Sequence, residues 1–118
     1  MEEGGEIAAA RTRVVLVTVP SVGAGKELAR QVVEEHLAAC GNVVPGLVSV
    51  YRWKGEVHED QEALIIFKTT EAALSELERR VVELHPYEVP ELLALPLTHG
   101  HLPYLRWVLG EVGEADTS

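Results

Sequence analysis

The sequence predicts an α+β protein built as a single domain, and three observations support this prediction. The chain has 118 residues, a length that suits one hydrophobic core. Runs of β-branched residues alternate with segments whose apolar residues recur every three or four positions, which is the spacing of one helix face. Hydrophobic residues make up 47% and charged residues 25%, a balance that indicates a globular chain and not a disordered one.

The first half of the domain is expected to hold two strands and one helix. Residues 13–19 are rich in β-branched side chains, which favours a strand. A loop of small residues follows, and the apolar positions of residues 26–39 then lie on one face of a helix. Pro45-Gly46 predicts a turn before a second strand at residues 47–53.

The second half of the domain completes the order β-α-β-β-α-β-α. Polar residues 54–60 are expected to be the connection of a hairpin between the second strand and a third strand at residues 62–69. Thr70 is a suitable N-cap for the helix that follows. A short strand at residues 92–97 and a last helix with Pro103 in its first turn come next. The first six elements match the ferredoxin-like βαββαβ pattern, in which both main helices cover one face of a four-stranded antiparallel sheet.

We predict one domain over residues 13–112, with flexible tails at residues 1–12 and 113–118. Acidic residues gather near both ends of the chain, and the formal net charge is −9. The charge pattern shows no stripe of Lys and Arg that could neutralise phosphates. Nucleic-acid binding is therefore not expected.

The sequence also argues against a membrane protein. No continuous apolar run approaches the ~20 residues that span a bilayer. The first residues are acidic where a secretory signal would be basic. Cys40 is the only cysteine, so no disulfide can form within the chain, and a cytoplasmic location is expected.

The strands are apolar on more faces than one helix layer can cover. Residues 63–67 are apolar on both sides of their strand. The second strand offers Val48 and Val50 on one side, with Tyr51 and Trp53 on the other. We expect subunits to pack sheet against sheet and so bury the second apolar face. The alternative is that the last helix and the tails cover it.

Three features resemble functional motifs but have simpler explanations. Residues 23–26 (GAGK) lack the first Gly and the Ser or Thr of a phosphate-binding loop, so a tight turn is favoured over nucleotide binding. Cys40 is expected at the end of the first helix, buried and inert. His99 and His101 could both reach one metal ion, although a solvated pair is favoured.

The most distinctive segment is HPYEVPE at residues 85–91. It brings an imidazole, a phenol and two carboxylates together between two prolines that restrict the backbone. From the residues alone, a functional site and a rigid turn are equally good explanations. Tyr51, Trp53 and Lys68, on the two predicted strands of a hairpin, could form either an interface core or a pocket wall.

Taken together, five segments resemble the CutA divalent-cation-tolerance family. They are VLVTVPS, LAACGNVVPGLVSVYRWKGEV, EALIIFKTT, HPYEVPELLALPLTHG and YLRWV, collinear from about Val14 to Val112. The resemblance implies a ferredoxin-like protomer in a tight homotrimer packed through the sheets. It also implies similarity to the nitrogen-regulatory PII proteins, which signal through a long loop between the second and third strands. Because the connection at residues 54–60 is short, such signalling is not expected here.

The resemblance also implies a site. The family is associated with tolerance of divalent metals, copper above all, and its members bind Cu(II). The candidate metal ligands are His85 and Glu91. The remaining residues of a cleft between protomers would be Tyr51, Trp53, Glu62, Lys68, Tyr87, Tyr104 and Trp107. Some bacterial relatives carry a cysteine where this chain has Val17, so ligation would rest on imidazole and carboxylate, which suit Cu(II).

We therefore expect a non-enzymatic, cytoplasmic, trimeric protein of divalent-cation tolerance that binds Cu(II) or another divalent cation and carries no organic cofactor. Its partners would be further copies of itself and the metal ion or a small molecule. The alternative is a PII-like sensor or carrier whose ligand lies between protomers against Tyr51, Trp53 and Lys68. No catalytic triad, metal–water site or cofactor loop in the sequence supports an enzyme.

Overall fold

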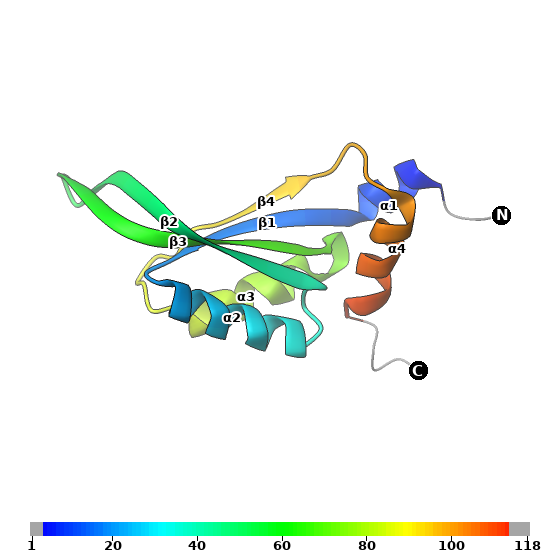
Figure 1. Cartoon of the computed structure of the whole chain (residues 1–118), viewed down its shortest axis with the longest axis horizontal. Helices are drawn as coiled ribbons and strands as arrows, with labels where there is room; N and C mark the ends of the chain where they lie inside the picture. Colours follow the sequence, from blue (N-terminus) through cyan, green and yellow to red (C-terminus); the bar gives the residue numbers. More distant parts are fainter. Residues whose placement is uncertain (1–3, 114–118) are drawn as a thin grey trace.

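The computed structural model describes residues 4–113 and confirms the α+β class with a four-stranded antiparallel sheet (Figure 1). The strands lie in the order β2-β3-β1-β4. The elements are α1 (Gly5–Arg11), β1 (Thr12–Val19), α2 (Val22–Glu34), β2 (Cys40–Trp53), β3 (Glu56–Thr70), the 3-10 turn η1 (Glu71–Ala73), α3 (Leu74–Leu84), β4 (Leu92–Pro96) and α4 (Leu102–Glu111). Within residues 4–113, no helix has the length and apolar character needed to span a bilayer.

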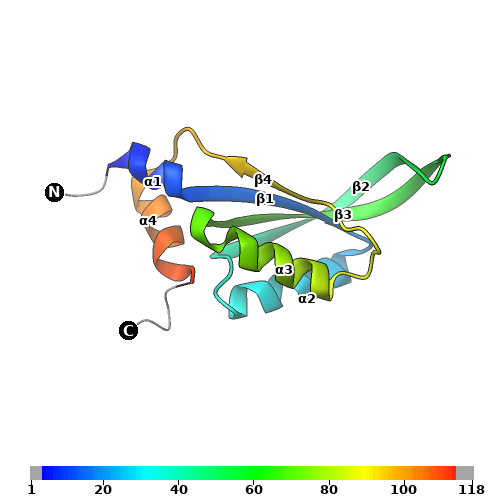
Figure 2. The same ribbon diagram turned by 180° about the vertical axis from the view of Figure 1, so that it is seen from behind.

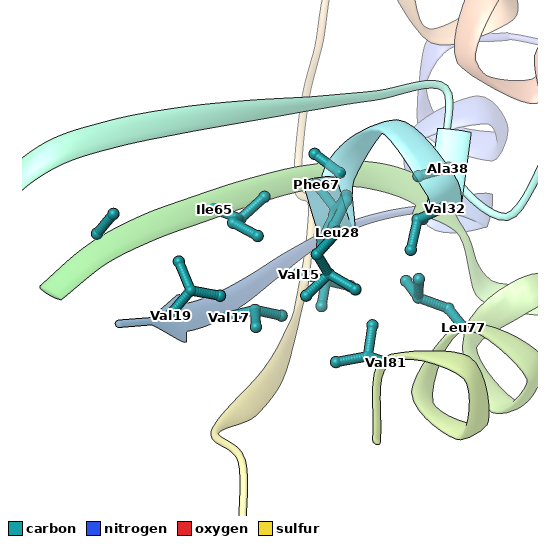
Figure 3. Packing of buried hydrophobic residues seen from close by; sticks show 12 residues of the cluster. Val15, Val17, Val19, Leu28, Val32, Ala38, Ile65, Phe67, Leu77 and Val81 are labelled. Carbon is teal, nitrogen blue, oxygen red and sulfur yellow. The ribbon is translucent and has the colours of Figure 1, made fainter. Parts of the chain in front are cut away.

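The core lies between the sheet and the two helices α2 and α3, which cover the same face (Figure 2). Alternate residues of β1 and β3 point into it, because side chains in a strand alternate between faces. Figure 3 shows how they meet the helix side chains. The sheet contributes Val15, Val17, Val19, Ala63, Ile65 and Phe67, and the helices contribute Leu28, Ala29, Val32, Leu77 and Val81.

Helix α2 begins four residues earlier than predicted, so the expected small-residue loop is its first turn. Ser21 caps the helix, and its hydroxyl accepts a hydrogen bond from the Ala24 amide at 3.1 Å. The small residues serve close packing. A Cβ atom on Gly25 would lie 3.0 Å from Val43 and 3.1 Å from Val19. This contact explains the glycine without any bound phosphate.

Strand β2 is twice as long as predicted, because the expected turn at Pro45-Gly46 is a bulge within it. Pairing with β3 continues on both sides of a register shift between Val44 and Leu47. Gly46 has a positive φ of 81°, which glycine adopts without strain. Cys40 begins this strand and is half-exposed, so it is neither at the end of a helix nor buried as predicted.

The predicted connection at residues 54–60 consists of only two turn residues. Lys54 and Gly55 both have positive φ, 53° and 84°, as the tightest hairpin turns require. The rest of that segment pairs with β2, from Trp53 opposite Glu56 to Ser49 opposite Asp60. The outer halves of β2 and β3 therefore form a two-stranded arm that projects beyond the helices (Figure 1).

The prediction of a flexible tail at residues 1–12 is wrong for residues 4–12, the part of it that the structure describes. Residues 5–11 form α1, which lies against α4 near the end of the sheet (Figures 1 and 2). Ala8 and Ala9 are buried with Leu105 of α4. The Thr12 hydroxyl donates to the Ala8 carbonyl at 2.8 Å and fixes the helix end. Residues 1–3 and 114–118, the remainder of the predicted tails, lie outside the described residues.

Burial of α1 predicts different effects for the same substitution at neighbouring positions. We expect Ala8→Gln to lower the free energy of unfolding by about 2 kcal/mol, because the longer polar side chain overfills a closed contact. Ala10→Gln, on the exposed side of α1, should change it by less than about 0.5 kcal/mol. Urea unfolding of both variants measures the difference. Equal values would show that α1 does not pack on α4.

Candidate functional site

His85 lies at the end of α3 and joins the HPYEVPE segment to β1. Its side chain is 7% exposed. Nδ1 lies 3.1 Å from the Tyr87 amide nitrogen, which can only donate, so Nδ1 accepts. Nε2 therefore carries the proton and donates to the Thr18 carbonyl at 2.7 Å. The ring is a neutral imidazole with both nitrogens engaged, and a metal at Nδ1 would have to displace the Tyr87 amide.

Glu91, the second predicted metal ligand, contacts the same end of β1 as His85. Its Oε1 accepts a hydrogen bond of 3.4 Å from the Thr18 hydroxyl. Thr18 thus contacts the imidazole through its carbonyl and the carboxylate through its hydroxyl. Thr18 was not among the predicted site residues, although a polar residue within the apolar run RVVLVTV was a signal for it.

One phenol–carboxylate pair lies beside His85, and a second lies farther out on the arm formed by β2 and β3. The Tyr87 hydroxyl donates to Glu62 Oε2 at 2.6 Å, and the ring of Tyr87 lies 4.7 Å from that of His85, centroid to centroid. Tyr51 donates to Asp60 on the arm. Burial, with the hydrogen bond to Glu62, raises the pKa of Tyr87 well above 10.0, and the hydrogen bond to Asp60 raises the pKa of Tyr51. These phenols stay neutral near neutral pH.

A second group of predicted residues lies at the opposite end of the sheet, next to α4. Lys68 donates to the side-chain oxygen of Asn42. The Tyr104 hydroxyl lies 3.7 Å from the Cys40 sulfur, and its ring lies 5.6 Å from that of Trp107, centroid to centroid. Burial, followed by the contact with Cys40, raises the pKa of Tyr104 to about 12.

The structure therefore divides the predicted site residues between two ends. His85, Glu91, Tyr87, Glu62 and Tyr51 gather at one end, and Lys68, Tyr104 and Trp107 at the other. Trp53 is the last residue of β2 before the turn, 5.7 Å from the Lys54 ammonium. Asn42 and Asp60 were missed, because strand pairing had to be known before their neighbours could be named.

The geometry does not assemble a complete metal centre in one chain. Among residues 4–113, no group of three or more His, Cys, Asp or Glu side chains is placed to hold an ion. His99 and His101 are both exposed and lie in the segment before α4. A cation at His85 and Glu91 would need further ligands from water or from another chain.

The face of the sheet away from α2 and α3 is largely apolar and open. In β3, the residues Leu64, Ile66 and Lys68 lie on this face. Their partners on β1 and β2 lie on it too, because residues paired across antiparallel strands share a face. Helix α4 lies across the end of the sheet and does not cover this face (Figure 1). Leu93 is 54% exposed, Leu95 45% and Val44 41%. We call this surface the open face; its apolar residues are Val14, Leu16, Val44, Leu64, Ile66, Leu93 and Leu95.

The chain combines a ferredoxin-like sheet and a long β2–β3 hairpin with a cluster of histidine, tyrosine and carboxylate side chains at the rim of the sheet. This combination places it in the class of small ferredoxin-like proteins whose polar site lies at the edge of the sheet. The family model described as "CutA1 divalent ion tolerance protein" matches residues 13–111. The chain therefore belongs to the CutA1 divalent-ion-tolerance family, which confirms the resemblance seen in the sequence.

Three relatives are similar over most of the chain. The divalent-cation tolerance protein CutA of Thermus thermophilus is 54% identical over 100 residues, covering 85% of this chain and 97% of that protein, and its solved structure has a TM-score of 0.84. The chloroplastic protein CutA 1 of rice is 49% identical over 86% of this chain and 58% of its own length. The solved rice CutA1 structure has a TM-score of 0.86, with coverage of 92% of this chain and 99% of that one. The human protein CutA is 48% identical over 92 residues, which make up 78% of this chain and 51% of the human protein.

The raised pKa of Tyr87 predicts a stability change at high pH. Above pH 10 the unfolded phenol loses its proton while the folded phenol keeps it, so the folded state binds more protons and loses stability as pH rises. Tyr87→Phe removes this contribution, at most about 1.4 kcal/mol per pH unit. Its free energy of unfolding should therefore fall less steeply than that of the wild type between pH 10 and 11.5.

Denaturant unfolding at several pH values tests this expectation. Tyr51→Phe is the matched control, because the Tyr51 phenol is more exposed to water and its removal should alter the slope less. Parallel curves for the wild type and Tyr87→Phe would contradict the raised pKa of Tyr87.

Proposed function

We propose that the protein is a non-enzymatic homotrimer that acts in divalent-cation tolerance by binding a divalent cation, with Cu(II) as the candidate. Membership of the CutA1 family supports the link to divalent cations. The observation that carries the cation site is the shared contact of His85 and Glu91 with Thr18, which brings imidazole and carboxylate to one strand end. Both are ligand types that Cu(II) accepts.

The hydrogen bonds of His85 support ligation through Nδ1. Metal-binding histidines commonly donate the other ring N–H to a carbonyl or carboxylate, which fixes the tautomer and ring orientation. Here Nε2–H donates to the Thr18 carbonyl, and the lone pair lies on Nδ1. An incoming ion would replace the Tyr87 amide at that lone pair. This competition favours modest affinity.

The open face supports self-assembly. Seven apolar residues from four strands remain uncovered there, and an apolar area of this kind is characteristic of a protein–protein interface. Copies of the same chain offer a matching apolar surface and allow closed symmetry. The cytoplasm remains our proposed location, on the grounds of the single cysteine, Cys40.

A PII-like sensor or carrier is the second candidate. The observation that favours it is that neutral phenols and a carboxylate gather at one rim of the open face, and an amine and aromatic rings at the other. Packing between copies could bring both sets around one small molecule.

Disruption of the open face should dissociate the assembly. We expect Leu93→Asp to lower the mass measured by light scattering from about three times the 12.9 kDa of one chain to that of a monomer, because a buried unpaired carboxylate is costly. Val82→Asp, at a valine of α3 that is 50% exposed, is the control and should stay trimeric. A monomeric wild type at micromolar concentration would contradict the assembly.

Calorimetric Cu(II) titration with a weak competing chelator tests the cation site. We expect Glu91→Gln and His85→Ala each to weaken binding by roughly tenfold or more. His99→Ala removes an exposed imidazole and should leave the affinity unchanged. Circular dichroism checks that His85→Ala is folded, and Glu91→Gln alters only an exposed side chain.

Equal affinities in all variants would contradict the site. Weak Cu(II) binding shared among the exposed histidines would also contradict the site at His85 and Glu91. In that case, thermal shifts with small metabolites in the presence of chelator would test the sensor hypothesis, because a ligand specific for the folded state raises the melting temperature.

A further inference from the structure

The open face carries two opposite charges that have no ion-pair partner within the described chain. Glu62 and Lys68 both lie on β3, face the same side and are half-buried. Glu62 accepts the Tyr87 phenol, and Lys68 donates to the Asn42 amide oxygen. The ion pairs of Arg13, Arg79 and Arg80 involve other side chains.

These two charges cannot meet within one chain. They are six positions apart along a strand, and each step adds about 3.3 Å, so they lie about 20 Å apart. The apolar side chains of Leu64 and Ile66 occupy the face between them. Covering this face with another copy removes both charges from water, and an unpaired charge in such a place destabilises the assembly.

We propose that Lys68 of one copy forms an ion pair with Glu62 of a neighbouring copy. The inference rests on the assembly proposed above and specifies its register: the basic end of one open face lies on the acidic end of the next. Glu62 keeps the Tyr87 hydroxyl on Oε2 and offers Oε1 to the incoming ammonium. Opposite charges at the two ends of the same face make the face complementary to a second copy of itself.

The pair also makes the rim cluster a composite site. In one chain, the cluster around Tyr87 holds phenols, an imidazole and carboxylates, with no Lys or Arg hydrogen-bonded to it among the described residues. Lys68 from the neighbour supplies the cation. Any ligand that enters the cluster then contacts two chains, and a divalent cation competes with Lys68 for the carboxylate.

Zero-length cross-linking of the wild type tests the proposal directly. A carbodiimide activates the Glu62 carboxyl group, the Lys68 amine attacks it, and an amide forms while the reagent leaves as a urea. Isotopically light and heavy chains are refolded together before the reaction. We expect peptides that join a light and a heavy copy through Lys68 and Glu62, because about 20 Å within a chain is far beyond the reach of this reagent.

Charge reversal gives an independent measurement. Lys68→Glu and Glu62→Lys should each raise the concentration at which half of the assembly dissociates by roughly tenfold or more. The double variant restores opposite charges and should return to within about threefold of the wild type. Lys26→Glu and Glu78→Lys make the same charge changes at exposed positions on α2 and α3, and should have little effect.

The possible failures are distinguishable. An oligomeric wild type without the Lys68–Glu62 cross-link, in which charge reversal leaves dissociation unchanged, would overturn the ion pair and leave the assembly intact. Protection of Lys68 by inorganic phosphate, with unchanged assembly in the variants, would assign Lys68 to a free anion and also overturn it. A wild type that is monomeric at all concentrations would overturn both the assembly and the pair.

Discussion

The constraint on which this structure depends is that two helices cover only one face of a four-stranded sheet. Alternation along β1 and β3 places Val15, Val17, Ile65 and Phe67 under the helices and leaves the intervening residues on the open face. Strand β1 is paired on both edges, with β3 and with β4, so its position within the sheet is fixed. The functional side chains therefore collect at the rims of the open face.

His85 shows how the rim is made rigid. A short polar segment between α3 and β4 could adopt many conformations, but two prolines restrict it and the buried ring attaches it to β1. The same ring accepts the Tyr87 amide, so the phenol is directed at Glu62. A structural and a functional reading of HPYEVPE are thus compatible, since the contacts that order the turn also arrange its chemical groups.

The parts of the fold predicted well are those whose signals are local. The apolar runs of β1 and β3 and the Thr70 cap, whose hydroxyl accepts the Ala73 amide, can be recognised from neighbouring residues alone. Helix α1 could not, because it depends on contacts with Leu105, almost a hundred residues away. Pro45-Gly46 is typical of a turn, and only the continued pairing with β3 makes it a bulge.

The candidate site was predicted in its residue types and not in its arrangement. Tyr87 and Glu62 were named, but their hydrogen bond depends on how the β3 register places Glu62 opposite the rim segment. Asn42 was missed because its role depends on its contact with Lys68 on the neighbouring strand. The distribution of the predicted cleft residues over the two ends of the sheet could not be predicted from neighbouring residues either, since it depends on the length and direction of β3.

The strand order has a consequence for how the protein is made. During synthesis β1 emerges before every strand that pairs with it, and its partners at residues 63–70 and 92–96 come much later. Helix α1 likewise forms its final contacts only after α4, the last element of the described residues, has been made. An apolar, β-rich segment thus stays without its final contacts while most of the polypeptide is translated, and such segments are prone to aggregation. Folding of these elements is therefore a late event, and protection of α1 and β1 at the ribosome matters more than protection of α4.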